Sequence, residues 1–404
     1  TGTTDTNGAD RVDWLKGVST KEERFTGGIF RDRKTTVLGD IANADLVYSR
    51  NEDFGYGSAA FTAAASEGAL YSTFLAGKSS RPGMVYAGAN DGMMHAFTAD
   101  KTTGGDEKFA YVPNAVYGKL SALTAPEYTH QYYVDGAAVV ADAFISGWKS
   151  VLVGGLANGG KAVFALDVSD PLGFDTTTDV LWEKNSTDTG YGNLGHIYGK
   201  PKVVRIDSGW VAIFGNGYNS STGKASLFVV NMADGSVLSE IVVDATGSDN
   251  GLSEPALVDT NGDRIMDYAY AGDLKGNMWK FDLKALTSPY NLFAAGASQP
   301  ITAAPTWGAS PDTSVGGLMV YFGTGKYLGV PDLATIATQS FYGIWDKGAA
   351  VVKSDLQVQT ILGVETGAGG RVLRKTSSND VVWSGTGAKL GWYMDLGYKD
   401  PATG

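Results

Sequence analysis

The sequence predicts an all-β fold, and three observations favour it over a helical one. Gly residues number 55 in a chain of 404, aromatic residues make up 11%, and charged residues make up only 19%. This composition is typical of many short strands joined by tight turns. Apolar runs that end in Gly also recur along most of the chain. We therefore expect one large β domain with one short helical insertion.

The recurring unit is an apolar run, a Gly-rich polar loop and a second apolar run. It occurs five times, at intervals of about 50 to 65 residues, and its marker glycines are Gly88, Gly154, Gly215, Gly272 and Gly323. Such a period indicates a repeat architecture, and radial repetition leaves only short sheet edges unprotected. We predict a modified β-propeller. Five hairpins plus two terminal portions favour seven blades, with six or eight as alternatives.

The segments that precede the first hairpin are less regular. Residues 1–36 are polar and Gly-rich, which predicts an N-terminal extension with a short helix or turn at 12–17. The run at 37–48 predicts the first strand. Apolar residues at helical spacing predict one short helix within 59–75, in which Gly68 is a weak point.

The propeller is expected to be a single domain over residues 37–404. The hairpin at 84–99 contains an Asn-Asp-Gly turn between two apolar runs, which is typical of a tight hairpin. The last recognisable strand, at 391–396, is expected to complete a blade begun near Val37 and so to close the ring.

The stretch at 259–267, which reads DTNGDRIMD, has spacing that predicts a calcium site. Side-chain oxygens stand at positions one, three, five and nine, and the backbone carbonyl of Ile265 is expected to serve at position seven. Calcium takes six to eight oxygen ligands, which alternate residues of a tight loop can supply. The expected ligands of one Ca²⁺ ion are Asp259, Asn261, Asp263, Ile265 and Asp267.

The alternative for this stretch is an ordinary solvated turn, because Asp, Asn and Gly also dominate turns. The sequence after Asp267 alternates aromatic and small residues, so the loop is expected beside a hairpin and not between two helices. A second stretch, DTNGAD at 5–10, has Ala9 at its fifth position. We therefore expect no metal there.

Charge and residue usage exclude several functions. The net charge of −11 argues against a nucleic-acid partner, because phosphate binding requires clusters of Lys and Arg. The chain has no Cys, which removes disulfides and thiolate chemistry. No apolar run reaches the roughly 18 residues of a membrane helix. Because Thr1 is not an initiator Met, we expect a fragment of a larger, exported protein.

The chain also lacks the markers of common enzymes. Its three histidines, His95, His130 and His196, are far apart in sequence and form no close-spaced metal pair. No Gly-x-Ser-x-Gly nucleophile elbow occurs, and the Gly-rich FGTGKY at 322–327 does not continue as a phosphate-binding loop. The nine Trp residues are interpreted as packing groups. We expect no enzymatic activity.

Several motifs follow one another in order over nearly the whole chain. The most specific is the block VDTNGDRIMDYAYAGDLKGNMWKFDL at 258–283, and the others are LGDI (38–41), VYAGANDGMMHAF (85–97), FGTGKYL (322–328), SFYGIWD (340–346) and GWYMDL (391–396). Together these motifs resemble the C-terminal propeller domain of the PilY/PilC family of type IV pilus proteins. The hairpin motifs alone are shared with many quinoprotein-like propellers.

The resemblance implies a quinoprotein-like, modified seven-bladed propeller that binds one calcium ion through the loop positions named above. It further implies that calcium occupancy tunes pilus extension against retraction, with roles in twitching motility and surface attachment. Partners would be pilus components such as minor pilins, or a host or abiotic surface, and the location would be the pilus tip or outer cell surface, reached through the periplasm. No Arg-Gly-Asp tripeptide occurs, so integrin binding is not expected. The alternatives are a quinoprotein-like dehydrogenase, which the lack of Cys disfavours, and a passive envelope scaffold.

Overall fold

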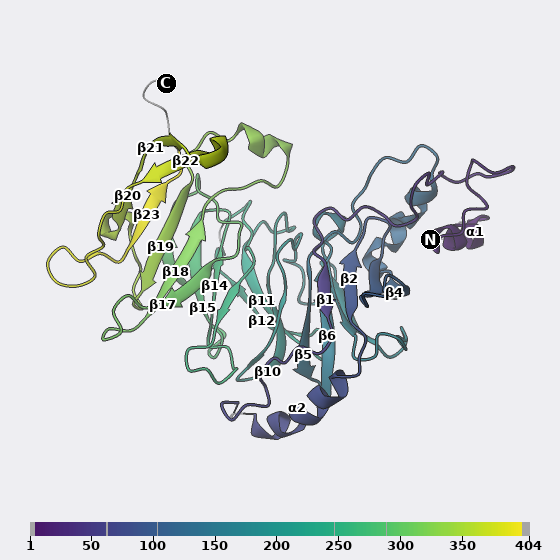
Figure 1. Ribbon diagram of the computed structural model, residues 1–404, viewed down its shortest axis with the longest axis horizontal. Coiled ribbons are helices and arrows are strands. Elements are labelled where there is room, and N and C mark those ends of the chain that lie inside the picture. Colours follow the sequence, from purple (N-terminus) through teal and green to yellow (C-terminus); the bar gives the residue numbers. More distant parts are fainter. Residues whose placement is uncertain (1–4, 62–63, 103, 246, 288, 398–404) are drawn as a thin grey trace. The chain divides into compact units, whose positions relative to one another are not determined.

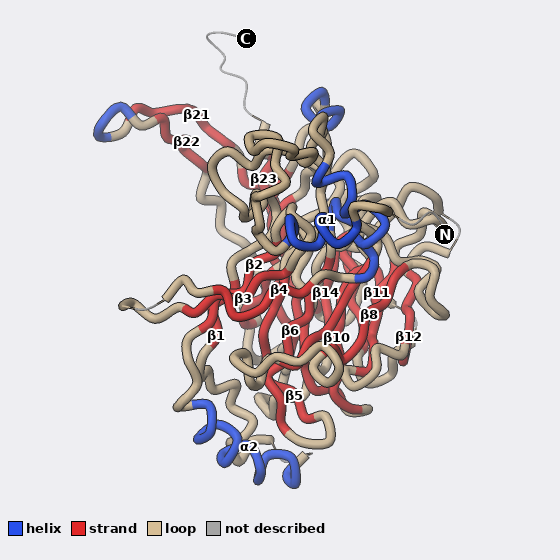
Figure 2. Tube along the Cα trace, turned by 90° about the vertical axis from the view of Figure 1, so that its right-hand side faces the viewer, coloured by secondary structure: helices blue, strands red, loops and turns tan. Residues whose placement is uncertain are grey.

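Strands dominate the computed structural model, which describes all residues except 1–4, 62–63, 103, 246, 288 and 398–404 (Figure 1). The strands pair mainly antiparallel, and helices are few (Figure 2). The predicted all-β class is therefore confirmed. The chain divides into two compact units, the first comprising Thr1–Val203, Trp210–Ala212 and Asn231–Ser236, and the second Val204–Gly209, Ile213–Val230 and Val237–Gly404.

Two four-stranded antiparallel sheets lie in the first unit, and each follows the chain order from edge to edge. The predicted hairpins at 84–99 and 150–168 are the central pairs β2–β3 and β6–β7 of these sheets. One sheet contains β1 (Val47–Ser49), β2 (Met84–Gly88), β3 (Met94–Thr98) and β4 (Glu107–Tyr111). The other contains β5 (Ala138–Phe144), β6 (Trp148–Gly155), β7 (Ala162–Asp167) and β8 (Val180–Asn185).

The other sheets follow later in the chain. A four-stranded sheet contains β9 (Lys202–Ile206), β10 (Gly209–Gly215), β11 (Ser226–Asn231) and β12 (Val237–Val242). Another contains β13 (Ala256–Val258), β14 (Tyr268–Gly272), β15 (Asn277–Asp282) and β16 (Tyr290–Ala294). A five-stranded sheet contains β17 (Thr306–Ala309), β18 (Leu318–Gly323), β19 (Ser340–Asp346), β23 (Gly391–Asp395) and β20 (Gln357–Gln359). A separate hairpin consists of β21 (Ile361–Thr366) and β22 (Val372–Thr376).

The helices are short. The α-helices are α1 (Gly8–Leu15) and α2 (Ala65–Lys78), and α2 is the expected helical insertion, although it begins and ends later than predicted and residues 62–63 lie outside the described part. Short 3₁₀ helices are η1 (Asn114–Thr124), η2 (Ala157–Gly159), η3 (Val330–Ala334), η4 (Lys353–Asp355) and η5 (Ala368–Gly370). Among the described residues, no helix has the length and apolarity required to cross a membrane.

A buried ion pair attaches α2 to the sheet β5–β8. The Lys78 ammonium lies 2.8 Å from the Asp142 carboxylate, and both side chains are almost fully buried. The Tyr71 hydroxyl donates to the same carboxylate at 2.8 Å, and the Trp148 indole donates to the Glu67 carbonyl at 2.8 Å. Because a buried charge is tolerated only when it is paired and hydrogen-bonded, these contacts fix the position of α2.

Each unit has its own apolar core. In the first unit, Trp14 and Phe30 of the N-terminal extension are buried in one cluster with residues of β2, β3 and β6. In the second unit, Val258 of β13 and Tyr270 of β14 are fully buried in a cluster that includes Phe293 of β16. The residues on either side of the 259–267 loop are therefore held by core packing.

The predicted strand at 37–48 is wrong over most of its length. Only β1 pairs as a strand, and Leu46 just before it is 65% exposed. Asn43 in this run contacts a residue distant in the sequence instead of joining a strand ladder. Asn43 donates to the Asp135 carboxylate through its backbone nitrogen at 3.1 Å and its amide nitrogen at 2.7 Å. Side-chain bonds of this kind compete with regular strand pairing.

The predicted pairing of the last strand is also wrong. β23 lies between β19 and β20, whereas the chain-initial strand β1 pairs with β2. Gly391 of β23 approaches Gly343 of β19 so closely that a Cβ atom at 391 would lie 2.1 Å from the Gly343 carbonyl oxygen. Gly391 also has φ +138, so glycine is required there. The number of blades stays a prediction.

Candidate metal centre

The 259–267 loop joins two directly paired strands. β13 and β14 are antiparallel, and their register pairs Val258 with Tyr268, so the strands meet at the two ends of the loop. The Asp267 backbone nitrogen donates to the Val258 carbonyl at 2.8 Å, which closes the loop. The expectation that the loop lies beside a hairpin is confirmed, because β14 continues into the β14–β15 hairpin.

Asp259 organises the backbone of this loop. Its Oδ1 accepts hydrogen bonds from the backbone nitrogens of Asn261 at 3.3 Å, Gly262 at 2.7 Å and Asp263 at 3.2 Å. Its Oδ2 accepts one from the Arg264 nitrogen at 2.9 Å. A carboxylate that satisfies successive amides holds the chain in a tight curve around itself.

The other two carboxylates fix the far half of the loop. The Asp263 Oδ1 accepts from the Ile265 backbone nitrogen at 2.8 Å. The Asp267 Oδ2 accepts from the Thr260 backbone nitrogen at 2.7 Å and from the Thr260 hydroxyl at 2.5 Å. Thr260 therefore links position two to position nine. Its role was missed in the sequence, because a Thr between two loop positions has no distinctive spacing.

The backbone of the loop turns through left-handed conformations. Gly262 has φ +78 and Arg264 has φ +68, and only the glycine adopts this region without cost. Beyond the turn, Ile265 is 4% exposed and forms a parallel bridge with Arg205 of β9, where the Met266 nitrogen donates to the Arg205 carbonyl at 2.9 Å. The Ile265 end of the loop is therefore anchored to a neighbouring strand.

The donor chemistry of the loop fits a hard cation. Three carboxylates, one amide oxygen and a backbone carbonyl are the oxygen ligands that calcium takes, and the loop contains no Cys or His. Among the described residues, none of the three carboxylates forms an ion pair with Lys, Arg or His; the nearby Lys284 pairs with Asp207. The negative charge of the loop is thus left for a cation.

The polar side chains of the loop form hydrogen bonds with one another and with the loop backbone. The Asn261 amide nitrogen donates to the Asp263 Oδ2 at 3.0 Å, and the Asn261 Oδ1 accepts from the Asp263 backbone nitrogen at 3.0 Å. In the part of the chain that the structure describes, no three Asp, Glu, His or Cys side chains converge on one point suited to a metal. The structure places the five predicted residues in one loop, and their role as calcium ligands stays a prediction.

A cavity of about 490 Å³ adjoins the loop, and Asp259 and Thr260 form part of its wall. Aromatic residues Tyr268 and Trp307 line it, and the Trp307 indole is fixed by donating to the Leu257 carbonyl at 2.8 Å. In its wall, Lys280 lies 2.8 Å from the buried Asp346 carboxylate. The loop is therefore continuous with a recessed surface of the second unit.

The other residues singled out in the sequence lie apart from this loop. Asp5 of the DTNGAD stretch pairs with Arg11 at 2.8 Å, near the start of α1. His95 is buried between the carboxylates of Glu107, at 2.5 Å, and Asp91, at 3.0 Å. Burial lowers the pKa of His95, but these two carboxylates more than offset it and raise the pKa above 6.5. His95 is interpreted as a structural ion-pair centre.

Comparison with known proteins places the chain in a family. The family model described as the PilY1 beta-propeller domain matches residues 38–291 and 287–378. The chain is 38% identical to the type IV pilus biogenesis factor PilY1 of Pseudomonas aeruginosa strain PAK, over 97% of this chain and 36% of that protein. It is 37% identical to a PilY1 homolog of Xylella fastidiosa strain Temecula1, over 95% of this chain and 27% of the homolog.

A solved structure agrees with these matches. The crystal structure of the Pseudomonas aeruginosa PilY1 C-terminal domain superposes with a TM-score of 0.71 at 36% identity, over 87% of this chain and 77% of that one. The chain spans about a third of the length of the curated relatives that it matches. On the family model, the relatives and the shared fold, this chain belongs to the PilY1 β-propeller domain family.

Proposed function

We propose that the chain is the calcium-binding propeller domain of a type IV pilus biogenesis factor, and that one Ca²⁺ ion held by the 259–267 loop regulates the activity of the pilus. The observation that carries the proposal is the loop itself. Its five oxygen-bearing positions lie between paired strands, and its three carboxylates have no cationic partner among the described residues. The membership of the chain in the PilY1 family supplies the connection with pili.

Calcium would act by removing repulsion within the loop. Asp259, Asp263 and Asp267 place three formal negative charges within nine residues, and like charges this close repel one another unless a cation lies between them. A bound cation stabilises the ordered loop by mass action, with the stabilisation set by the ratio of free ion to its dissociation constant. In this proposal the loop residues catalyse no reaction. They bind the ion and thereby fix the shape of the surface around the loop.

The surface that would change shape when calcium binds is the cavity beside the loop. Because Asp259 and Thr260 belong both to the loop and to the cavity wall, a rearrangement of the loop carboxylates changes the shape of this recess. The Trp307 indole, held by its hydrogen bond to Leu257, and the Lys280–Asp346 pair in the cavity wall would remain in place. Calcium occupancy would thereby switch a contact for a partner, such as a minor pilin.

The cellular role follows from the proposed location. We place the chain outside the cell, at the pilus tip or the outer cell surface, as part of a larger exported protein. There, calcium occupancy would bias pilus extension against retraction and so affect twitching motility and attachment to host or abiotic surfaces. The relatives are named as biogenesis factors and not as enzymes, and we propose no catalytic activity for this chain.

The experiment that tests this role uses the full-length protein in its own bacterium. Asp263→Ala removes one proposed ligand, and Arg264→Gly is the matched control because it changes the adjacent residue without removing a ligand oxygen. We expect Asp263→Ala to alter the number of surface pili and the width of the twitching zone at equal protein levels, and Arg264→Gly to behave as the wild type. Wild-type piliation and motility in Asp263→Ala would refute the regulatory role and leave the passive scaffold.

A further inference from the structure

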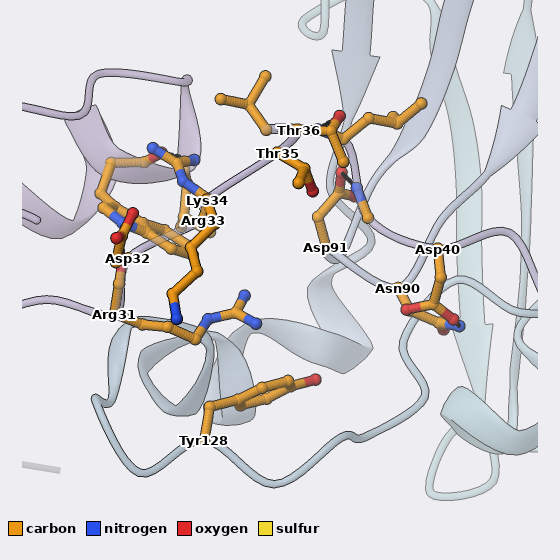
Figure 3. Close-up of a pocket in the computed structure, with 15 residues that line it drawn as sticks. Arg31, Asp32, Arg33, Lys34, Thr35, Thr36, Asp40, Asn90, Asp91 and Tyr128 are labelled. Carbon is orange, nitrogen blue, oxygen red and sulfur yellow. Dashed lines mark hydrogen bonds between the residues drawn. The ribbon is translucent and has the colours of Figure 1, made fainter.

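A second recess lies in the first unit, between the N-terminal extension, the β2–β3 turn and Tyr128. Its volume is about 310 Å³, and the segment 31–40 forms most of its wall (Figure 3). The wall carries three cationic residues, Arg31, Arg33 and Lys34. The calcium proposal gives this recess no role, so its charges need a separate explanation.

The acidic residues of the recess all have partners. Asp32 pairs with Arg24 at 3.0 Å, and Asp91 pairs with His95 at 3.0 Å. Asp40 pairs with His130 at 3.0 Å and also accepts from the Asn90 amide at 2.8 Å. Each carboxylate thus has a hydrogen-bond partner, a His partner being charged only when protonated, and among the described residues none lies within ion-pair distance of Arg31 or Lys34.

Of the three cationic residues, only Arg33 is neutralised. Its guanidinium contacts the Glu22 carboxylate at 2.7 Å and donates to the Trp14 carbonyl at 2.6 Å. Within the described part of the chain, Arg31 and Lys34 have no carboxylate within ion-pair distance. Among the described residues, the recess consequently contains two positive charges that have no ion-pair partner.

Arg31 is held in one position by its neighbours. Its Nε donates to the Leu123 carbonyl at 2.9 Å, and its guanidinium carbon lies 4.2 Å from the centre of the Tyr128 ring. Its two terminal nitrogens have no hydrogen-bond acceptor among the described residues, and a guanidinium uses this edge to bind two oxygens of an anion. In Figure 3 the guanidinium lies over Tyr128, and the side chain of Lys34 runs down toward it.

The surroundings of Arg31 favour an anion further. Burial lowers the pKa of Arg31, and the neighbouring Arg33 lowers it as well, so the positive charge is poorly solvated in the absence of a counter-ion. A pre-positioned, partly desolvated guanidinium loses little conformational entropy when it binds. These are the conditions under which a charge-assisted hydrogen bond is strong.

We propose that this recess is an oxyanion site, in which the terminal nitrogens of Arg31 bind a carboxylate or phosphate group and Lys34 adds a second positive charge. The volume accommodates a small anionic group and not a large ligand. A larger, apolar groove of about 810 Å³ shares Leu15, Val37, Leu38 and Asp91 with the recess, so the body of a ligand with an apolar tail has a surface to lie on.

The test is a binding titration of the purified chain in a low-salt, phosphate-free buffer. The probes are inorganic phosphate, acetate and octanoate, measured by calorimetry. We expect at least one probe to bind saturably with one site per chain, and to bind more weakly as sodium chloride is added. Tighter binding of phosphate than of acetate identifies a phosphate ligand; tighter binding of octanoate than of both identifies an aliphatic carboxylate in the adjoining groove.

Three variants separate this site from general surface charge. Arg31→Gln is expected to weaken binding at least tenfold, and Lys34→Gln several-fold. Lys21→Gln, which removes an exposed lysine paired with Asp10 outside the recess, is expected to bind as the wild type does. Because Lys34 is exposed and has no partner among the described residues, its variant is expected to fold normally even if Arg31→Gln does not. Failure of every probe to saturate, or unchanged binding in Lys34→Gln, would overturn the proposal.

Discussion

At the scale of single residues, Asp259 has two separable tasks. It accepts hydrogen bonds from four successive backbone nitrogens of its own loop, and it is the first proposed calcium ligand. The first task needs no metal. The loop therefore has some order of its own, which reduces the conformational entropy that calcium binding must overcome.

Replacing Asp259 by Ala should therefore weaken the chain even when calcium is chelated. We expect a loss of about 1 kcal/mol in the free energy of unfolding, because several loop amides lose their acceptor and turn to water. Hydrogen exchange of the amides of residues 261–264 should accelerate in the variant. Ile265→Val, which keeps the carbonyl and the acceptors, is the control; equal exchange rates in wild type and Asp259→Ala would contradict this account of the loop.

His95 predicts a pH dependence in the first unit. Its pKa in the folded chain is raised above 6.5, because the hydrogen bonds and charges of Asp91 and Glu107 outweigh burial. The protonated form therefore stabilises the folded state fully below pH 6.5, and this contribution is lost as pH rises through the raised pKa. In urea unfolding, the free energy of unfolding of the wild type minus that of His95→Gln should decrease as pH rises above 6.5. A difference between the two that stays constant with pH would refute the assignment.

The sequence predicts the residues of the 259–267 loop but not those of the recess at Arg31. Alternating oxygens identify 259–267 in the sequence because all five positions belong to one loop. The sequence could not indicate that Asn261 donates its amide to Asp263 or that Thr260 binds Asp267, since these contacts depend on side-chain rotation. The recess at Arg31 was not predicted at all. Arg31 contacts Leu123 and Asp40 contacts His130, and the residues of each pair are about 90 positions apart in the sequence.

At the scale of elements, the structure confirms the predictions that depend on a sequence pattern within one short segment. Hairpins such as β2–β3 and β14–β15 contain two apolar runs and a turn within one short segment, so the sequence specifies them and the structure confirms them. The failures involved pairing between distant segments. The segment before β1 satisfies Asn43 through Asp135, and β23 pairs with β19 through a close glycine contact. Neither partner is indicated by a local pattern.

The attachment of α2 depends on the Lys78–Asp142 pair, which yields a prediction for this element. Lys78→Ala leaves the Asp142 carboxylate buried without its cation, so we expect a loss of about 3–5 kcal/mol in the free energy of unfolding. Lys108→Ala, which breaks a solvent-exposed pair with Asp106, should cost about 0–1 kcal/mol. Chemical denaturation measures both. A similar small loss in the two variants would show that the buried pair does not hold α2.

At the scale of the whole molecule, the chain consists of two compact units with different proposed ligands. The first unit contains the cationic recess at Arg31, and the second contains the loop at 259–267. The family relationship extends over both units, and the relatives are considerably longer than this chain. A ligand that binds only the folded state stabilises it by about 2.7 kcal/mol at one hundred times its dissociation constant. Calcium should therefore raise the stability of the second unit by an amount that grows with the logarithm of the ratio of free calcium to its dissociation constant.

The most direct test of the central claim is the calcium content of the purified chain at equilibrium. Dialysis against a defined concentration of free calcium, followed by elemental analysis, should give one calcium ion per wild-type chain. Chelator should remove it. Asp263→Ala should retain none, while circular dichroism shows the same β-sheet signal as the wild type. A wild-type chain that binds no calcium at saturating concentration, or an Asp263→Ala variant that binds as much as the wild type, would contradict the account.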